Sequence, residues 1–197
     1  SKDLVDINVR FQKERKEDDP IYMPYKRDEK LVRSWAIPGT KGLEHRVGGL
    51  EKDQETGNVS YDPENHHQMV KIRAAKVDKI ADYIPLQELE SGSENSKLIV
   101  VGWGSTFGAI KTAVRDLASE GIDVAHTQIK YIQPMPKNFG EILSNYDKIL
   151  VPEMNNGQLI KLIRDRYLVD AKPLNKIKGM PFEAQEIKSA ILNMLNL

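Results

Sequence analysis

The stretch KLIVVGWGSTFGAI, residues 97–110, decides the fold of this chain. Its four consecutive apolar residues, 98–101, predict a strand that is buried on both faces of a sheet. Residues 102–106 then turn the chain into an amphipathic helix whose apolar residues recur at spacings of three and four. A buried strand, a tight turn and a helix are the opening of an α/β unit.

The same alternation continues to the end of the chain. Further strands are predicted at residues 122–131, 148–151 and 172–177, and each is followed by a helical pattern. The first helix should end at Gly121, because glycine favours helix C-termini. Strands and helices that alternate in this way predict right-handed crossovers and a mostly parallel, doubly wound sheet between two layers of helices.

The first 61 residues show no such period. Residues 5–11 predict a short amphipathic strand, and the charge run 13–19 is interpreted as a solvated linker. The segment up to Tyr61 nevertheless carries many large apolar side chains, each of which gains about 1.5–3 kcal/mol on full burial. They are Tyr22, Met23, Tyr25, Trp35, Ile37, Leu43 and Val47. We therefore interpret this part as an arm that lies against other protein, and the chain, which starts at Ser1 with a polar stretch, as a piece of a longer polypeptide.

Residues 62–84 predict a connecting helix between the arm, 1–61, and the α/β domain, 85–197. Asp62 is the expected N-cap and Pro63 the first helical residue. One stripe of the helix is apolar, and we interpret its basic face as solvated. The stripe consists of Val70, Ala74, Val77, Ala81 and Ile84, and the basic face of Lys71, Arg73, Lys76 and Lys79. Residues 86–89 then predict a short edge strand.

Composition excludes several classes of function. The 29 basic and 29 acidic residues give a formal net charge of zero, so nothing directs the chain to nucleic acid or to an anionic membrane. Without cysteine there can be no disulfide, thiolate nucleophile, iron–sulfur cluster or zinc-thiolate site in this chain. The sequence shows no signal peptide and no apolar run of membrane-spanning length, which makes the cytoplasm the expected location.

Ligands of an open parallel sheet gather at the carboxyl ends of its strands, where residues 102–106, 133–136 and 153–157 should arrive. Gly102, Gly104 and Gly108 form a G-x-G-x-x-x-G pattern, one residue longer than the dinucleotide fingerprint, and no acidic residue follows at the ribose position. Backbone N–H groups with the hydroxyls of Ser105 and Thr106 could hold an anion. The alternative, which we favour, is a plain tight turn capped by one of these hydroxyls.

The second polar segment, Glu153-Met154-Asn155-Asn156-Gly157, is open to two interpretations. Glu153, Asn155 and Asn156 could contact a ligand, or they could form the turn and cap that start a helix, and we favour the cap. The four histidines do not predict a metal site, because the pair His66-His67 points in two directions on a helix and no ligand pair at i, i+4 occurs. His126, within a strand, is interpreted as a satisfied core or interface histidine.

Three blocks of sequence resemble the C-terminal half of the α subunit of 2-oxoacid:ferredoxin oxidoreductases, with the 2-oxoglutarate type the nearest in pattern. The blocks are PYKRDEKLVRSWAIPGTKGLEHRVGGLEKDQETGNVSYDPENHHQMVKIRAAKV (24–77), VVGWGSTFGAIKTAV (100–114) and LVPEMNNGQL (150–159). The resemblance covers nearly the whole chain. It implies the tail of a pyrimidine-binding domain at 1–61 and, at 85–197, a domain similar to the transketolase C-terminal domain. Such a domain has a five-stranded sheet with one antiparallel strand, here residues 86–89.

Enzymes of this family oxidatively decarboxylate a 2-oxoacid on thiamine diphosphate, pass electrons through iron–sulfur chemistry to ferredoxin and release an acyl-CoA. The resemblance therefore implies thiamine diphosphate, Mg, an iron–sulfur cluster and CoA in the complete enzyme. Its partners would be the remainder of the α subunit, the β subunit and, indirectly, ferredoxin, with a homodimer as a further option. The diphosphate-binding motif, the residue that activates the pyrimidine and the cluster cysteines have no counterpart here, so we expect no catalytic residue and no cofactor bound by this chain alone.

The resemblance thus implies a non-catalytic portion that supports assembly and forms one wall of the substrate or CoA channel. The residues expected there are Gly102, Gly104, Ser105, Thr106, Glu153, Asn155 and Asn156. Two alternatives stay open. One is a stand-alone regulatory module that binds an anion or nucleotide through residues 102–106. The other is a pure assembly domain without ligand contact.

Overall fold

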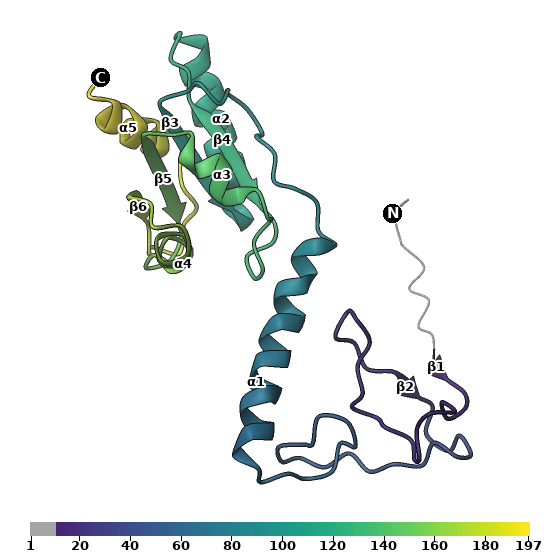
Figure 1. The fold of residues 1–197 in the computed structure, drawn as a ribbon. Helices are drawn as coiled ribbons and strands as arrows, with labels where there is room; N and C mark the ends of the chain where they lie inside the picture. The colour runs from purple at the N-terminus through teal and green to yellow at the C-terminus, as the bar shows by residue number, and fades with distance from the viewer. Residues whose placement is uncertain (1–10) are drawn as a thin grey trace. The chain divides into compact units, whose positions relative to one another are not determined.

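A computed structural model describes residues 11–197, and the chain divides into two compact units, Ser1–Ile80 and Ala81–Leu197. Each unit is described by itself below. The second contains the α/β sheet with its helices, whereas the described part of the first consists mainly of turns and irregular backbone followed by one long helix (Figure 1).

The second unit is built on a four-stranded, entirely parallel sheet in the order β4-β3-β5-β6. Its strands are β3 (Leu98–Trp103), β4 (Ala125–Ile129), β5 (Lys148–Glu153) and β6 (Ala171–Asn175). Its helices are α2 (Phe107–Ser119), α3 (Phe139–Ser144), α4 (Gln158–Tyr167) and α5 (Ala184–Leu195), with the short helix η2 (Gly104–Thr106) between β3 and α2. The central strand β3 is the predicted apolar run, and residues 98–101 are completely buried.

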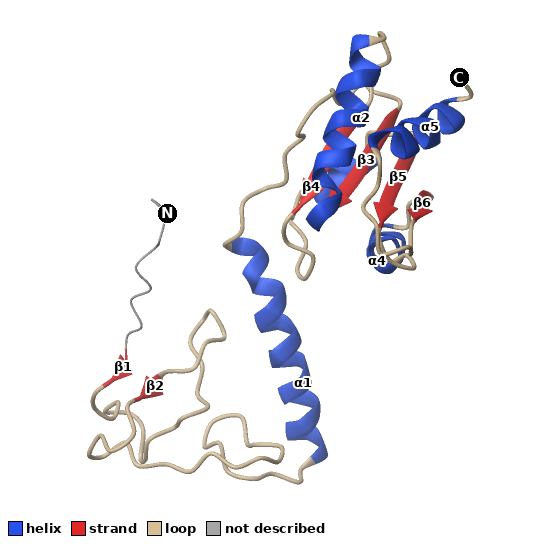
Figure 2. Cartoon of the chain, turned by 180° about the vertical axis from the view of Figure 1, so that it is seen from behind, coloured by secondary structure: helices blue, strands red, loops and turns tan. Residues whose placement is uncertain are grey.

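Helices cover both faces of this sheet. Ile99 and Val101 pack with Phe139 and Leu143 of α3 and with α4, whereas Leu98 and Val100 pack with α2 and α5. The two views show the layers from opposite sides, with α3 before the strands in Figure 1 and α2 before them in Figure 2. The predicted three-layer, doubly wound α/β/α fold is therefore confirmed, and alternation of side chains along β3 supplies both cores.

The predicted fifth strand was wrong. Residues 86–89 form no strand, and the described sheet has four strands, none of them antiparallel. The segment nevertheless runs along the free edge of β4, where Ser91 and His126 form a single antiparallel bridge. Side chains replace the missing ladder, since Thr127 Oγ1 donates to Glu88 O at 2.8 Å and Gln87 Nε2 donates to Thr127 Oγ1 at 2.8 Å.

The two edges of the sheet differ. The β4 edge is covered by this segment, and Gly92 approaches the strand so closely that an added Cβ would lie 2.5 Å from Ala125 Cα. The other edge strand, β6, has a mostly exposed sequence and includes Lys172 and Pro173. A proline in an edge strand lacks the N–H that a further strand would need.

The first unit has little regular structure in its described part. Strands β1 (Phe11–Gln12) and β2 (Trp35–Ala36) pair in parallel over two residues, and turns fill most of the remainder. Of its large apolar side chains, Tyr22, Leu43 and Met69 are buried. Residues 5–10 of the predicted strand 5–11 lie outside the described residues. The charge run 13–19 is exposed except at its end, where our interpretation fails, because Asp19 is buried and pairs with Lys26 at 2.6 Å.

Helix α1 (Pro63–Asp78) continues as the short helix η1 (Lys79–Asp82). Its predicted N-cap is confirmed, since Asp62 Oδ1 accepts a hydrogen bond from Glu64 N at 3.0 Å. Met69 is the one buried residue of α1, whereas Val70, Ala74 and Val77 of the predicted stripe are exposed. No helix within residues 11–197 has both the length and the apolar character that crossing a membrane requires.

Candidate functional site

The loop after β3 brings Gly104, Ser105 and Thr106 to the carboxyl edge of the sheet. Gly104 adopts a φ of +57°, which glycine tolerates best, and starts the short helix η2. The hydroxyl of Thr106 is buried and already used, because it accepts from Trp103 N at 3.2 Å and donates to Trp103 O at 2.9 Å. Ser105 is exposed, and its Oγ lies 3.6 Å from Met154 Sδ. Of the two hydroxyls, Ser105 is the one available to a ligand.

Gly102 serves packing beneath this loop. A Cβ added there would lie 2.3 Å from Gln128 Oε1 and 2.5 Å from Ile110 Cδ1. The residue is buried in β3, directly opposite Gln128 of β4. Its lack of a side chain therefore lets α2 and the Gln128 side chain approach the strand, and no ligand is needed to explain it.

Glu153 ends β5 as a completely buried carboxylate. It accepts hydrogen bonds from Leu159 N at 2.8 Å, Ile160 N at 3.0 Å and Asn155 Nδ2 at 3.1 Å. The first N–H groups of a helix lack partners within the helix and carry partial positive charge, so this carboxylate is the anion that the N-terminus of α4 needs. Asn155 Oδ1 completes the turn by accepting from Gly157 N and Gln158 N at 2.8 and 2.9 Å.

The two loops meet at a hollow of about 250 Å³ that is lined by Trp103, Gly104, Ser105, Thr106, Met154 and Asn155. Glu153 and Asn156 are not part of the lining, and Asn156 is exposed. No charged side chain lines this hollow, and no side chain caps the N-terminus of α2 within the described structure. The arrangement can therefore contact a polar or anionic group through backbone N–H groups and the Ser105 hydroxyl, but it holds no titratable group for acid–base chemistry.

The third expected segment, residues 133–136, does not share this hollow. Met135 is buried in the core on the α3 side, and Pro136 lines a separate hollow of about 170 Å³ beside Gln128, Lys130 and Tyr131. The sequence predicted that the three segments lie at one edge of the sheet. It could not show that the first two line one hollow and that Pro136 lines another.

The histidines occupy unrelated positions. His126 is completely buried in β4 beside Phe107, at a ring-centroid distance of 5.8 Å, but both ring nitrogens lack a hydrogen-bond partner among the described residues. His126 is therefore a core histidine, but its ring nitrogens are not hydrogen-bonded in the described part of the chain, contrary to our interpretation. Burial lowers its pKa. His66 Nδ1 lies 2.7 Å from Glu51 Oε2, and within residues 11–197 no three His, Asp or Glu side chains are grouped as metal ligands.

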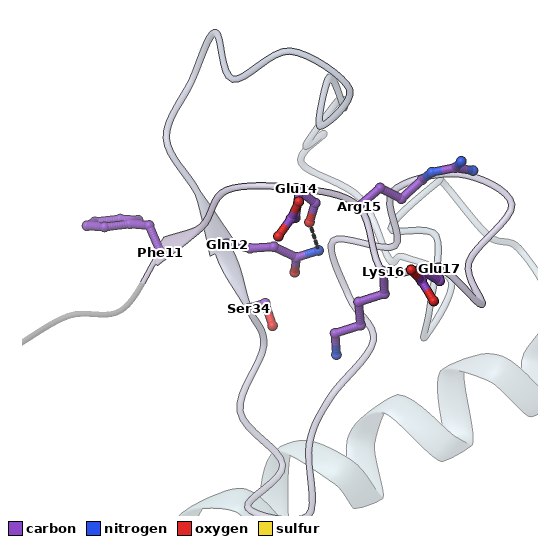
Figure 3. A pocket seen from close by; sticks show the side chains of 7 residues that line it. All are labelled: Phe11, Gln12, Glu14, Arg15, Lys16, Glu17 and Ser34. Atoms are coloured by element: carbon purple, nitrogen blue, oxygen red, sulfur yellow. Dashed lines mark hydrogen bonds between the residues drawn. The ribbon is translucent and has the colours of Figure 1, made fainter.

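A larger hollow, about 550 Å³, lies beside β1 and β2 in the first unit. Its lining mixes two acidic and two basic side chains, Glu14, Glu17, Arg15 and Lys16, which do not converge on one point (Figure 3). Gln12 Nε2 donates to the Glu14 carbonyl at 2.8 Å, so part of the polar lining is already paired. The geometry does not support a binding site here.

Comparison with known proteins relates both units to one family. The model of the pyruvate:ferredoxin oxidoreductase core domain II matches residues 96–189. The 2-oxoglutarate oxidoreductase subunit KorA of Mycobacterium tuberculosis is 46% identical over 167 residues, which cover 84% of this chain and 25% of that protein. The chain belongs to the 2-oxoacid:ferredoxin oxidoreductase family. It matches α or KorA subunits of the family along most of its length, so the resemblance seen in the sequence is confirmed.

Two further members of the family show how much of a subunit the chain represents. The 2-oxoglutarate synthase subunit KorA of Methanocaldococcus jannaschii is 30% identical over 92% of this chain and 49% of its own length. A solved structure, the 2-oxoglutarate:ferredoxin oxidoreductase from Magnetococcus marinus with 2-oxoglutarate, coenzyme A and succinyl-CoA bound, matches with a TM-score of 0.82 and 29% identity over 91% of this chain and 32% of that one. The chain therefore spans between about a quarter and a half of the length of these family members.

Proposed function

We propose that this chain is the C-terminal portion of an α subunit of a 2-oxoglutarate:ferredoxin oxidoreductase. The complete enzyme would oxidatively decarboxylate 2-oxoglutarate to succinyl-CoA with thiamine diphosphate, and would pass the electrons to ferredoxin. The similarity to 2-oxoglutarate-type subunits supports this assignment, as does the solved relative, whose described ligands are the substrate, the acyl acceptor and the product of this reaction. A cytoplasmic location is part of the proposal.

The role that we propose for this portion rests on the hollow between the loops 104–106 and 154–155. It is neutral, opens at the carboxyl edge of the sheet and presents backbone groups, the exposed Ser105 hydroxyl and the partly buried Trp103 and Met154. Such a surface can contact a substrate or CoA without reacting with it. We therefore assign it to one wall of the substrate or CoA channel, with Gly104, Ser105, Thr106 and Asn155 as contacts.

The iron–sulfur cluster does not fit this chain, and the Mg–diphosphate group does not fit the hollow of the second unit. An iron–sulfur cluster requires thiolate ligands, and the chain has no cysteine. Mg with a bound diphosphate requires carboxylate or amide oxygens, but the carboxylate of Glu153 is fully engaged by α4 and does not line the hollow. We assign thiamine diphosphate, Mg and the cluster to the remainder of the α subunit and to the β subunit.

The first unit would serve assembly. Trp35, Ile37, Val47 and Leu50 are between 54% and 60% exposed, which leaves much apolar area in contact with water. Burying that area against the rest of the enzyme would stabilise the complex. We propose that residues 1–61 continue a pyrimidine-binding domain, that 62–84 connect it and that 85–197 form the α/β domain.

A substitution that fills the hollow tests this function in the complete enzyme. Ser105→Trp should raise the KM for CoA or 2-oxoglutarate and leave the assembly intact, because the added indole occupies the channel wall. Asn156→Trp is the matched control, since Asn156 is exposed and does not line the hollow. Unchanged kinetics in the Ser105 variant would favour the pure assembly domain.

The isolated chain tests the rival regulatory module. Our proposal expects thiamine diphosphate to bind no more tightly than pyrophosphate, because we assign recognition of the thiamine rings to the remainder of the enzyme. A module that senses anions or nucleotides through residues 102–106 should instead bind ATP, NAD or CoA by calorimetry, and Ser105→Ala should weaken that binding. Specific recognition of the thiamine rings by this chain alone would refute the proposal.

A further inference from the structure

The first unit contains a cationic hollow that the sequence did not reveal. Its volume is about 250 Å³, and its apolar walls are Tyr25, Met69 and Ile72. Five basic residues and one acidic residue complete the lining: Arg27, Arg33, Lys52, Arg73, Lys76 and Glu51. The chain as a whole has no net charge, so a local excess of four positive charges is a specific feature of this place.

The single carboxylate is already engaged. Glu51 accepts from Arg73 Nη1 and Nη2 at 3.2 and 3.3 Å, and its Oε2 lies 2.7 Å from His66 Nδ1. These contacts, Arg73 first and then His66, lower the pKa of Glu51 to about 2, so it stays ionised under all ordinary conditions. Glu51 therefore neutralises Arg73, and four basic side chains remain without a counter-charge in the lining.

The remaining cations are held close together by neutral groups. Arg27 Nη1 donates to the carbonyls of Tyr25 and Gln54 at 3.0 and 3.1 Å, and Lys52 Nζ donates to Leu50 O at 2.6 Å. Burial lowers the pKa of Arg27, and the positive charge of Arg33 lowers it further, so proximity of the two guanidinium groups is unfavourable. Neither Arg33 nor Lys76 has a carboxylate partner among residues 11–197.

The walls of the hollow are fixed in place. The Arg33 guanidinium lies 4.3 Å from the centroid of the Tyr25 ring, within the range of a cation–π contact. Gly57 is buried with a φ of +73°, and a Cβ there would lie 2.5 Å from Tyr25 Cδ2, so the glycine makes room for the ring. On the other side, Met69, Ile72, Arg73 and Lys76 follow one another at helical spacing along one face of α1.

We propose that this hollow binds a phosphate-bearing ligand, with Arg33 and Lys76 as the principal contacts. A cluster of five cations with a single carboxylate is destabilised by the mutual repulsion of its unpaired charges until a multiply charged anion enters. Phosphate and diphosphate groups carry two or more charges, and the planar guanidinium fork matches their oxygens. The apolar walls would hold the uncharged part of such a ligand. The inference does not depend on the function proposed for the second unit.

Calorimetric titration of the full chain with pyrophosphate at low ionic strength tests the inference. The chain should bind pyrophosphate more tightly than inorganic phosphate, and Arg33→Gln and Lys76→Gln should each weaken binding about tenfold, the effect of losing one charge-assisted contact. Lys71→Gln is the matched control, because it removes the same charge from the same helix at a position outside the lining, and it should change the affinity less than about twofold.

Three results would overturn it. They are the absence of any pyrophosphate binding, an equal loss of affinity in Lys71→Gln and Lys76→Gln, and binding of citrate as tight as that of pyrophosphate, which would show a surface that recognises charge alone. Circular dichroism verifies that each variant is folded. Should Arg33→Gln not fold, Lys76→Gln, which changes an α1 lysine without any charged partner in the described chain, decides the question alone.

Discussion

The two units of this chain use the same kinds of side chain in opposite ways. In the second, residues 98–101 and the helices on both sides bury their apolar groups in two cores, whereas in the first Trp35, Ile37 and Val47 are more than half exposed. The second unit is thus stabilised by its own interior. The described part of the first is shaped by turns, ion pairs and the buried side chains of Tyr22, Leu43 and Met69, and several of its large apolar side chains are exposed.

The largest effect should come from Glu153→Ala in the second unit. The substitution leaves the N–H groups of Leu159 and Ile160 buried without an acceptor, at a cost of about 1–3 kcal/mol each. We expect the free energy of unfolding in urea, followed by circular dichroism, to fall by about 2–6 kcal/mol. Asn156→Ala, at an exposed position of the same loop, is the control. An equally small loss of unfolding free energy in both variants would show that the carboxylate does not stabilise α4.

A somewhat smaller loss is expected for Gly92→Ala at the covered edge of the sheet. The new Cβ would meet Ala125 Cα and Val124 O at 2.5 and 2.6 Å, and the residue has a φ of +80°. Backbone cannot yield as a flexible side chain can, so we expect a loss of about 2–4 kcal/mol. Gly121→Ala separates the two causes, since Gly121 has a φ of +81° with nothing within 4 Å, and it should lose about 1–2 kcal/mol.

The two tryptophans compare the units directly. Trp103 packs against the core of the second unit, whereas Trp35 is 60% exposed in the first. Trp103→Ala should therefore destabilise its unit by about 2 kcal/mol, less than the full cost of a completely buried tryptophan. Trp35→Ala should change stability by no more than about 0.5 kcal/mol in the isolated chain. An equally large loss at Trp35 would mean that the first unit depends on its own apolar contacts.

The smallest effect that we expect is a change in how the stability of the second unit depends on pH. Burial lowers the pKa of His126 below the ordinary 6.5, so the unfolded chain takes up a proton in acid before the folded chain does. The stability of the second unit should accordingly decrease as the pH falls from 6.5 toward the folded pKa, and His126 should not affect it well above pH 6.5. His126→Phe should abolish this part of the pH dependence, whereas His67→Phe, at an exposed position of the first unit, should retain it.

The difference between the regular second unit and the irregular first unit also explains which features the sequence could predict. An apolar run and helical spacing identify β3 and its flanking helices, because regular elements repeat their pattern locally. The N-cap at Asp62 could be predicted for the same reason, because its signal lies in adjacent residues. Leu162, by contrast, shares the helical spacing of the buried Leu159 and Ile163 and yet is 45% exposed, because α4 is covered on one side only.

Contacts between distant residues left no such local pattern. The carboxylate of Glu153 reaches N–H groups six and seven residues later, and Gln87 caps an edge through Thr127, forty residues on. The cationic hollow joins Arg27 and Arg33, on irregular backbone, to Arg73 and Lys76 of a helix that appeared merely solvated. Whether residues 102–106 and 153–157 contact a ligand stays a prediction.

The unlike edges of the sheet also restrict how copies of this chain could associate. A second sheet cannot add to β4 without displacing the segment that Ser91 and Gly92 anchor there, and at β6 it would face a proline and a lysine. Continuous sheets shared between two molecules are therefore disfavoured at both ends. Any homodimer would have to associate through helices or through the exposed apolar side chains of the first unit.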